Sequence, residues 1–345
     1  MGPTRPLLPR SVGLIALLAL MAGGVFVSSA YGGSVTGSGY SVASVMDMTP
    51  RQQWNANFGY CGETSFIQAG MYYGQYTSQW TARNLATPGV PQTKHASQLL
   101  LNANDLKAAK KMKLNATSFD HRRLRTTQQY FEWVKAQVGR GYPVIIGVYD
   151  NKRALDEPLP GDPDYDHIAP VMAIDEKTIT ISDNGLYEDQ LQRPYLFTYS
   201  RASFPKTRSQ ANQQGGAIYS LRATAPNFAT AVTGVRDQSG VTAAVRLTAN
   251  INGEGIQDQP KLKAPPPPLP VTLTATVAIA DQSVAYRVYL YSDFARVPTK
   301  DFNAQAANAE RSWTIPAGTG PKWTVSINTT TDQTKVFRAV PITAS

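Results

Sequence analysis

Two different patterns of hydrophobic and polar positions divide the chain. In the first half, apolar residues recur at helical spacing over 95–112 and 126–139, which predicts two amphipathic helices. Short apolar runs over 142–149, 167–175 and 178–182 predict strands, and the last two are close enough to form a hairpin. The second half shows short alternating runs, which we expect to form strands over 241–249, 271–279, 284–291, 311–315, 322–327 and 335–340.

These patterns predict an α+β chain with two domains. Mixed helices and strands continue to residue 222, so we expect the first domain over 45–222. The alternating strands beyond it are typical of a β-sandwich, which we expect over 223–345 as an accessory domain. A Pro-rich segment over 264–270 is either an inter-strand loop or a stiff spacer.

The N-terminus has the layout of a secretory signal peptide. A basic start is followed by an apolar run over 12–27 and by the small residues Ser28, Ser29 and Ala30. We expect cleavage after Ala30, which leaves 31–44 as an N-terminal extension and makes the protein secreted. The alternative is an uncleaved signal anchor that tethers the chain to a membrane. No later run is apolar enough to span a bilayer, so we expect no membrane contact after cleavage.

Composition excludes several classes of protein. Hydrophobic residues make up 42% of the 345 residues, enough for packed cores and too many for a disordered chain. The formal net charge of +9 is not concentrated in a basic run, and no phosphate-binding glycine loop is present, so we expect no nucleic-acid partner. Acceptor triplets at Asn115 and Asn328 fit a secreted glycoprotein.

The single cysteine is the strongest indication of chemistry. Secreted proteins normally carry cysteines in disulfide pairs, and Cys61 has no partner in the chain. Gly59 and Gly62 bracket it as in a tight turn, and an apolar helical stripe follows, with Glu63 in the expected first turn. A helix N-terminus favours the thiolate form of a cysteine and offers free N–H groups to an oxyanion. We therefore expect Cys61 to be a nucleophile.

A thiol nucleophile needs a base and a group that orients the base. Of the three histidines, His95 and His121 have the surroundings of surface residues, whereas His167 begins an apolar strand. The hairpin that follows returns its second strand beside this histidine, which brings Asp183 or Asn184 close to the imidazole. The residues alone leave open which of the two orients the ring.

The Gly-Tyr-Cys61-Gly core, the His167 strand and the Asp183-Asn184-Gly turn, in this order, resemble the papain-like cysteine peptidase superfamily. The compact bacteriocin-leader-processing peptidases are the most similar group within it, and the resemblance covers 45–222. It implies Cys61 as nucleophile, His167 as general base and acid, and Asp183 or Asn184 as the orienting residue. It also implies a side-chain amide that helps to bind the oxyanion, and Asn55 stands at the matching position.

The chain departs from the cathepsin pattern. Cathepsins carry a second cysteine shortly before the nucleophile, whereas here Gly59 stands two residues before Cys61. Gly62 takes the place of the aromatic residue after the nucleophile, and His167 follows sooner. The segment between Ala30 and Cys61 is also too short for a folded inhibitory propeptide. Transglutaminase-like acyl transferases share the Cys–His–Asp order, but they too carry an aromatic residue after the cysteine.

These observations predict a secreted cysteine peptidase-like hydrolase that needs no cofactor and no metal, with a peptide or protein as substrate. The acidic loop 150–166 lacks the glycine and glutamate of a calcium-binding EF-hand loop, and we expect it to edge the substrate cleft and favour basic peptides. Two alternatives stay open. One is a transglutaminase-like acyl transferase. The other is a catalytically silent binding protein, whose C-terminal domain would hold a cell-surface or glycan ligand.

Overall fold

The computed structural model describes residues 44–124, 126–150, 165, 167–185, 196–200, 219–220, 227–236, 243–251 and 261–342. The expected signal peptide, nearly all of the expected extension 31–44 and most of the acidic loop 150–166 lie outside these residues. All described residues belong to one compact unit. Within them, no helix combines the length and apolar character needed to cross a membrane.

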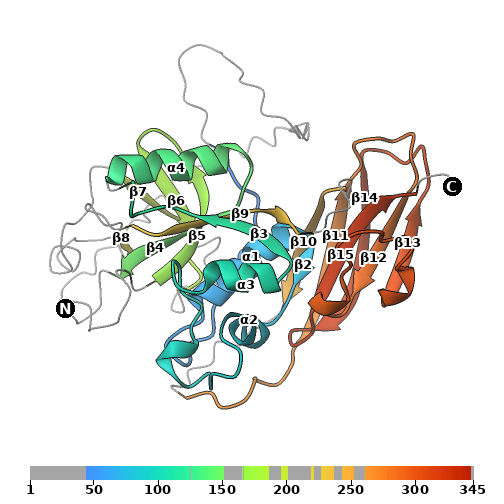
Figure 1. Ribbon diagram of the computed structural model, residues 1–345. Helices are drawn as coiled ribbons and strands as arrows, with labels where there is room; N and C mark the ends of the chain where they lie inside the picture. The colour runs from blue at the N-terminus through green and yellow to red at the C-terminus, as the bar shows by residue number, and fades with distance from the viewer. Residues whose placement is uncertain are drawn as a thin grey trace, which may run out of the picture. The chain divides into compact units, whose positions relative to one another are not determined.

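The fold is α+β, and its largest element is an antiparallel sheet (Figure 1). Its strands lie in the order β3 (Leu114–Ser118), β9 (Ala229–Val235), β4 (Val144–Asp150), β5 (His167–Ile174), β6 (Thr178–Ser182) and β7 (Leu196–Ser200). Two short strands join it: β1 (Ser44–Val45) pairs with β5, and β8 (Tyr219–Ser220) pairs with β4. The predicted hairpin of β5 and β6 is confirmed.

Helices lie on both faces of this sheet (Figure 1). On one face lies α4 (Thr127–Gly139), which begins with a capping box between Thr126 and Gln129 and confirms the predicted helix. On the other face lie α1 (Cys61–Tyr72) and α3 (Asp105–Lys111), and α2 (Gln79–Ala86) packs against both of these helices. Each face of the sheet therefore has its own hydrophobic core.

The helix predicted over 95–112 is wrong in its first part. Only a short 3-10 turn, η1 (His95–Ser97), and α3 form there. Between them, the Leu100 N–H bonds to the Asn104 side chain, and the Asn104 amide donates to the Gln98 carbonyl. The Leu99 N–H bonds to the carboxylate of Glu63. These side chains satisfy backbone groups that a helix would otherwise pair, so the chain stays irregular there.

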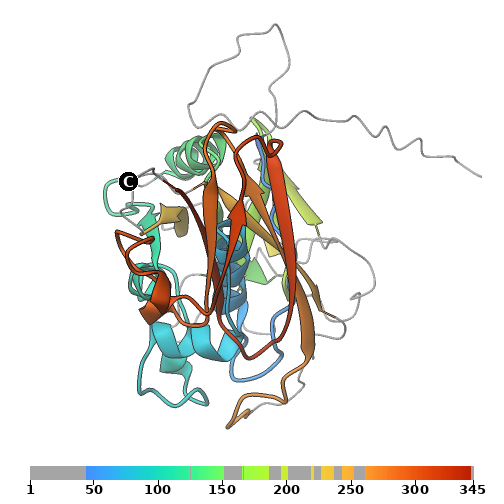
Figure 2. The ribbon, with the colours of Figure 1, turned by 90° about the vertical axis from the view of Figure 1, so that its right-hand side faces the viewer.

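The C-terminal strands form two antiparallel sheets that share one hydrophobic core (Figure 2). One sheet contains β10 (Val245–Ile251), β11 (Pro270–Ala278) and β14 (Lys322–Thr330), and the other contains β13 (Arg311–Ile315), β12 (Tyr286–Tyr291), β15 (Lys335–Pro341) and β2 (Gln75–Tyr76). The 3-10 turns η2 (Phe294–Arg296) and η3 (Ala306–Asn308) lie between β12 and β13. All six strands predicted here are confirmed, with ends shifted by a few residues.

The C-terminal sheets are joined to the rest of the chain more closely than the sequence predicts. Strand β9 lies beyond the boundary expected at residue 222, yet it pairs with β3 and β4 in the large sheet. Strand β2 follows α1 and pairs with β15. Ile67 and Met71 of α1 belong to the same core as the C-terminal strands. The Pro-rich segment lies between β10 and β11, so it is an inter-strand connection and not a spacer between domains.

Candidate active site

Cys61 is the first residue of α1 and carries a free, partly exposed thiol. The preceding residue, Tyr60, is the N-cap and makes no capping hydrogen bond with its side chain. The first N–H groups of a helix have no partner within the helix, and the helix dipole is positive at this end. A negatively charged sulfur or oxygen is therefore favoured here, and the predicted helix start at Cys61 is confirmed.

Glycine at position 62 is required by close packing. A Cβ atom added to Gly62 would overlap with the carbonyl oxygen of Leu99 and would lie 3.2 Å from Cδ1 of Ile168. The first turn of α1 is therefore wedged between the irregular segment before α3 and strand β5. A side chain at position 62 would therefore displace the backbone of Leu99.

His167 and Asp183 form a buried pair at one end of the β5–β6 hairpin. His167 is the first residue of β5, and Asp183 directly follows β6, so the hairpin register brings them together. The Nε2 atom of His167 lies 2.9 Å from Oδ1 of Asp183, and Oδ1 also accepts a hydrogen bond of 2.6 Å from the Gly185 N–H. This leaves Nδ1 as the ring nitrogen that can face the thiol, and Cys61 is close enough to contribute to the raised pKa of His167.

The surroundings of His167 favour its charged form. Burial alone lowers the pKa of the imidazole, because the interior solvates a cation poorly. The negative charge of Asp183 and its hydrogen bond act in the opposite direction, with a smaller contribution from Cys61, and together they raise the pKa of His167 to about 10. The pair is therefore set up to hold an imidazolium next to the sulfur at neutral pH.

Asn184 has a different place from Asp183. Its Nδ2 atom lies 3.0 Å from Oγ of Ser65, 3.2 Å from the Cys61 carbonyl and 3.3 Å from the Ile168 carbonyl. Ser65 Oγ in turn donates to the Cys61 carbonyl at 2.8 Å. Asn184 thus ties the first turn of α1 to β5, and Asp183 is the residue that contacts the imidazole.

Asn55, the residue that the resemblance matches to the oxyanion-binding amide, is exposed in the segment before Cys61, and its role stays a prediction. Gln53 is buried instead, and its side-chain amide packs against Gly59, so that a Cβ at Gly59 would lie 3.4 Å from Oε1 of Gln53. The backbone N–H of Gln53 donates to the Asn184 carbonyl at 2.8 Å, and this bond holds Gln53 beside the turn that carries Asp183. Oε1 of Gln53 accepts no hydrogen bond from the described part of the chain. Among the described residues, Gln53 is thus a buried amide with an unused acceptor, as are Gln68 and Asn184.

The spacing of Gln53 follows from an unusual turn before Cys61. Asn57, Phe58 and Gly59 all have positive φ angles, of 47°, 69° and 83°. Three consecutive left-handed residues curl the chain tightly, so Gln53 comes back beside the turn although it lies further from Cys61 than Asn55 does. Such conformations cost free energy for residues other than glycine and need support from the surrounding structure.

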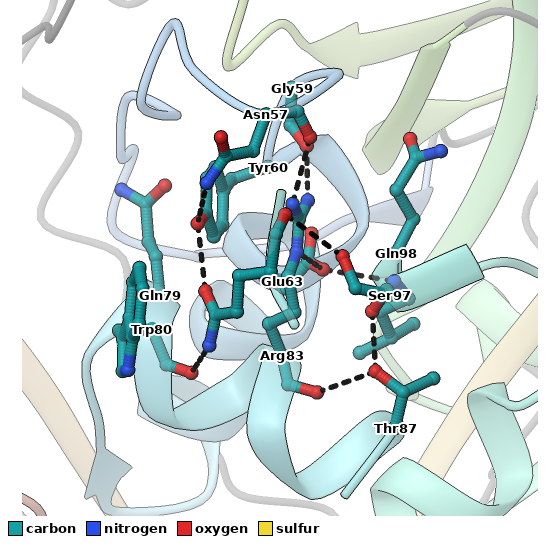
Figure 3. Close-up of polar contacts among 12 residues, drawn as sticks. Asn57, Gly59, Tyr60, Glu63, Gln79, Trp80, Arg83, Thr87, Ser97 and Gln98 are labelled. Carbon is teal, nitrogen blue, oxygen red and sulfur yellow. Dashed lines mark hydrogen bonds and ion pairs between the residues drawn. The ribbon is translucent and has the colours of Figure 1, made fainter. Parts of the chain in front are cut away.

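Arg83 of α2 supplies this support from inside the molecule (Figure 3). Its guanidinium donates to the carbonyl of Asn57 at 2.9 Å and to the carbonyl of Gly59. It also lies over the Tyr60 ring, with Cζ 3.6 Å from the ring centroid. Arg83 is fully buried, so its charge needs a counter-ion.

Glu63 is that counter-ion. Its Oε1 atom accepts from Nε of Arg83 at 2.6 Å and from the Leu99 N–H at 2.9 Å (Figure 3). The sequence predicts Glu63 in the first turn of the helix, which is confirmed, but the carboxylate bonds to the neighbouring segments. The buried Arg83–Glu63 pair thus fixes the turn before Cys61 and the segment packed against Gly62.

The C-terminal region also contacts this turn. The side chain of Asn57 makes two hydrogen bonds to the backbone of Leu262, each 2.8 Å long. Leu262 precedes the Pro-rich segment and packs with Trp54 and Tyr60 in a small buried cluster. Residues that follow β10 therefore help to hold the loop that leads to Cys61.

The other predicted residues make different contacts. The ring of His95 stacks edge-on against Phe58, and the ring of His121 stacks against Phe228. Asn115 lies in β3 and its Nδ2 donates to the Val235 carbonyl at 2.9 Å, whereas Asn328 lies in β14 and accepts from Thr272. Glycosylation of these asparagines stays a prediction. Within the described residues, no three His, Cys, Asp or Glu side chains are grouped as a metal site would require.

Comparisons with protein-family models, with curated proteins and with solved structures gave no match to this chain.

Proposed function

We propose that this chain is a papain-like cysteine peptidase-like hydrolase that cleaves peptide or amide bonds. The observation that carries the proposal is the contact of His167 with both Asp183 and Cys61, at the start of a helix. A nucleophile, a base in hydrogen-bonding reach and a carboxylate that holds the base are the groups that nucleophilic acyl transfer requires.

The acylation step follows from this arrangement. The Cys61 thiolate attacks the carbonyl carbon of the substrate, and a carbon–sulfur bond forms while the carbonyl oxygen becomes negatively charged. The Cys61 N–H and Nε2 of Gln53 are the donors that we assign to this oxyanion. The His167 imidazolium then gives its proton to the amide nitrogen, the carbon–nitrogen bond breaks, and the amine leaves.

The deacylation step uses the same residues. Neutral His167 takes a proton from water as the water attacks the thioester carbonyl, and Asp183 stabilises the imidazolium that forms. Collapse of the intermediate breaks the carbon–sulfur bond and releases the carboxylic acid, so the thiolate–imidazolium pair is restored. An amine in place of water would give acyl transfer by the same route.

A peptide library digest tests this function. The full chain is incubated under reducing conditions with the library, with and without an added primary amine, and the products are identified by mass spectrometry. New C-terminal carboxylates are expected, which is hydrolysis. Amine-capped products in their place would indicate the transglutaminase-like alternative. If neither product forms, the proposed function is wrong, and the binding-protein alternative gains support.

Secretion is a further part of the proposal, supported by the N-terminal sequence alone. An oxidising compartment normally selects against a lone thiol, and a catalytic role is a reason to keep one.

A further inference from the structure

Phe58 is the most exposed large hydrophobic side chain in the described part of the chain. Its side chain is 60% exposed, and Leu106, at 45%, is the other residue of this kind there. The Phe58 ring meets the His95 ring edge-on, with centroids 5.4 Å apart and an angle of 79° between the planes. The two rings form an aromatic pair at the surface.

The backbone of Phe58 is held in a conformation that suits glycine better. Its φ angle of 69° is rare for a bulky residue, and a glycine there would avoid the steric cost. Arg83 holds the turn through the carbonyls of Asn57 and Gly59, on either side of Phe58. The Asn57 side chain is bonded to Leu262. Within this turn, Phe58 is thus the residue that presents a large side chain to solvent.

Both residues of the pair belong to segments that meet the first turn of α1. Phe58 precedes Cys61 by three residues, in the turn that leads into α1. His95 begins the segment that runs to Leu99, which contacts Gly62 and bonds to Glu63 in the first turn of α1. An extended peptide covers about 3.3 Å per residue, so a peptide bound at Cys61 can reach the turn that carries Phe58 within a few residues of the cleaved bond.

We propose that Phe58 and His95 form an aromatic subsite that binds an apolar side chain of the peptide substrate. This inference rests on the proposed function and adds a substrate class to it. A strained residue that is kept at a functional site is commonly explained by ligand contact, and an exposed aromatic ring gains by burial against an apolar partner. The subsite would make the enzyme favour peptides with an aromatic or large aliphatic residue near the cleaved bond.

Phe58→Gly separates this role from a structural one. Glycine removes the ring and relieves the left-handed strain, so the melting temperature is expected to stay the same or rise. Iodoacetamide is too small a molecule to need the subsite, so the rate at which it alkylates Cys61 is expected to stay the same. For a matched pair of peptides that differ only at the preferred apolar position, kcat/KM is expected to fall about tenfold or more for the apolar peptide and little for its serine counterpart.

Two further variants complete the experiment. Phe58→Asn keeps a side chain that tolerates positive φ and should show the same loss of selectivity. Leu106→Ala removes the other exposed hydrophobic side chain, on α3, and should leave both peptides unaffected. Equal changes on both peptides, or slower alkylation in Phe58→Gly, would overturn the inference. If the wild-type chain cleaves neither peptide, the proposed function fails first and this inference fails with it.

Discussion

Replacing Cys61 with alanine is expected to abolish turnover and to leave the fold intact. The variant lacks the atom that forms the acyl bond, so the remaining oxyanion donors and binding contacts can supply only a small part of the rate. Removing a nucleophile of this kind lowers kcat by a factor on the order of 10⁴ or more. The thiol is partly exposed and unpaired, and alanine is a good helix former, so the melting temperature should change little.

The measurement is the rate of peptide cleavage, with circular dichroism as the control for folding. Cys61→Ser should be nearly as inactive, because a serine hydroxyl is far less acidic than a thiol and is not activated by the same imidazolium. A Cys61→Ala variant that still cleaves peptides at more than about one hundredth of the wild-type rate would exclude the thiol as the nucleophile.

The second large effect is on stability. Arg83→Met is expected to destabilise the fold by about 3–5 kcal/mol, because it leaves the buried Glu63 carboxylate without its counter-ion. It also removes the donors that hold the Asn57 and Gly59 carbonyls in the left-handed turn. The free energy of unfolding can be measured by urea titration, followed by tryptophan fluorescence.

Two controls identify the cause of this loss. The double variant Arg83→Met, Glu63→Gln removes both charges and should recover part of the stability. Lys135→Met breaks the ion pair with Glu176, whose side chains are 34% and 52% exposed, and should cost less than about 1 kcal/mol. If Arg83→Met costs no more than Lys135→Met, the buried pair does not support the turn as described.

Local patterns predicted most of the strands correctly. The individual strands follow from alternation and turn residues, and in the pairs β5–β6, β10–β11 and β12–β13 the next strand in the chain is also the partner in the sheet. Pairings between distant segments were missed. Strand β9 pairs with β3 and β4 from far along the chain, and β2 is too short to give any pattern. Such pairings depend on how the helices pack, which a local pattern does not contain.

The candidate site, too, could be predicted from the sequence only in part. The contact of Cys61, His167 and Asp183 could be expected from a lone cysteine at a helix start and from the hairpin register. The sequence left open whether Asp183 or Asn184 contacts the imidazole. The structure decides this, because the Asp183 side chain points to His167 and the Asn184 side chain points to Ser65. Gln53 and the supporting Arg83 were missed, because a residue count cannot reveal a turn with three positive φ angles. The Asn-Phe-Gly sequence was the available signal, since asparagine and glycine favour that conformation.

We propose that Asp183 keeps His167 charged beside the sulfur of Cys61. The pKa of His167 is raised to about 10 from an ordinary value of 6.5, so the imidazole stays protonated at pH 6 and loses its charge only well above neutrality. In Asp183→Asn the counter-charge is gone and burial then lowers the pKa, so the ring should be neutral at pH 6. The sulfur would lose the positive charge that stabilises its anionic form.

The most direct test is the rate of iodoacetamide alkylation at pH 6, measured by mass spectrometry on the full chain. Because Cys61 is the single cysteine, the urea-unfolded chain gives the rate of an unactivated thiol in the same sequence. The native chain is predicted to react at least about tenfold faster than the unfolded chain, and Asp183→Asn is predicted to lose most of this advantage. A native rate no higher than the unfolded rate, or an unchanged rate in Asp183→Asn, would show that His167 and Asp183 do not activate the thiol.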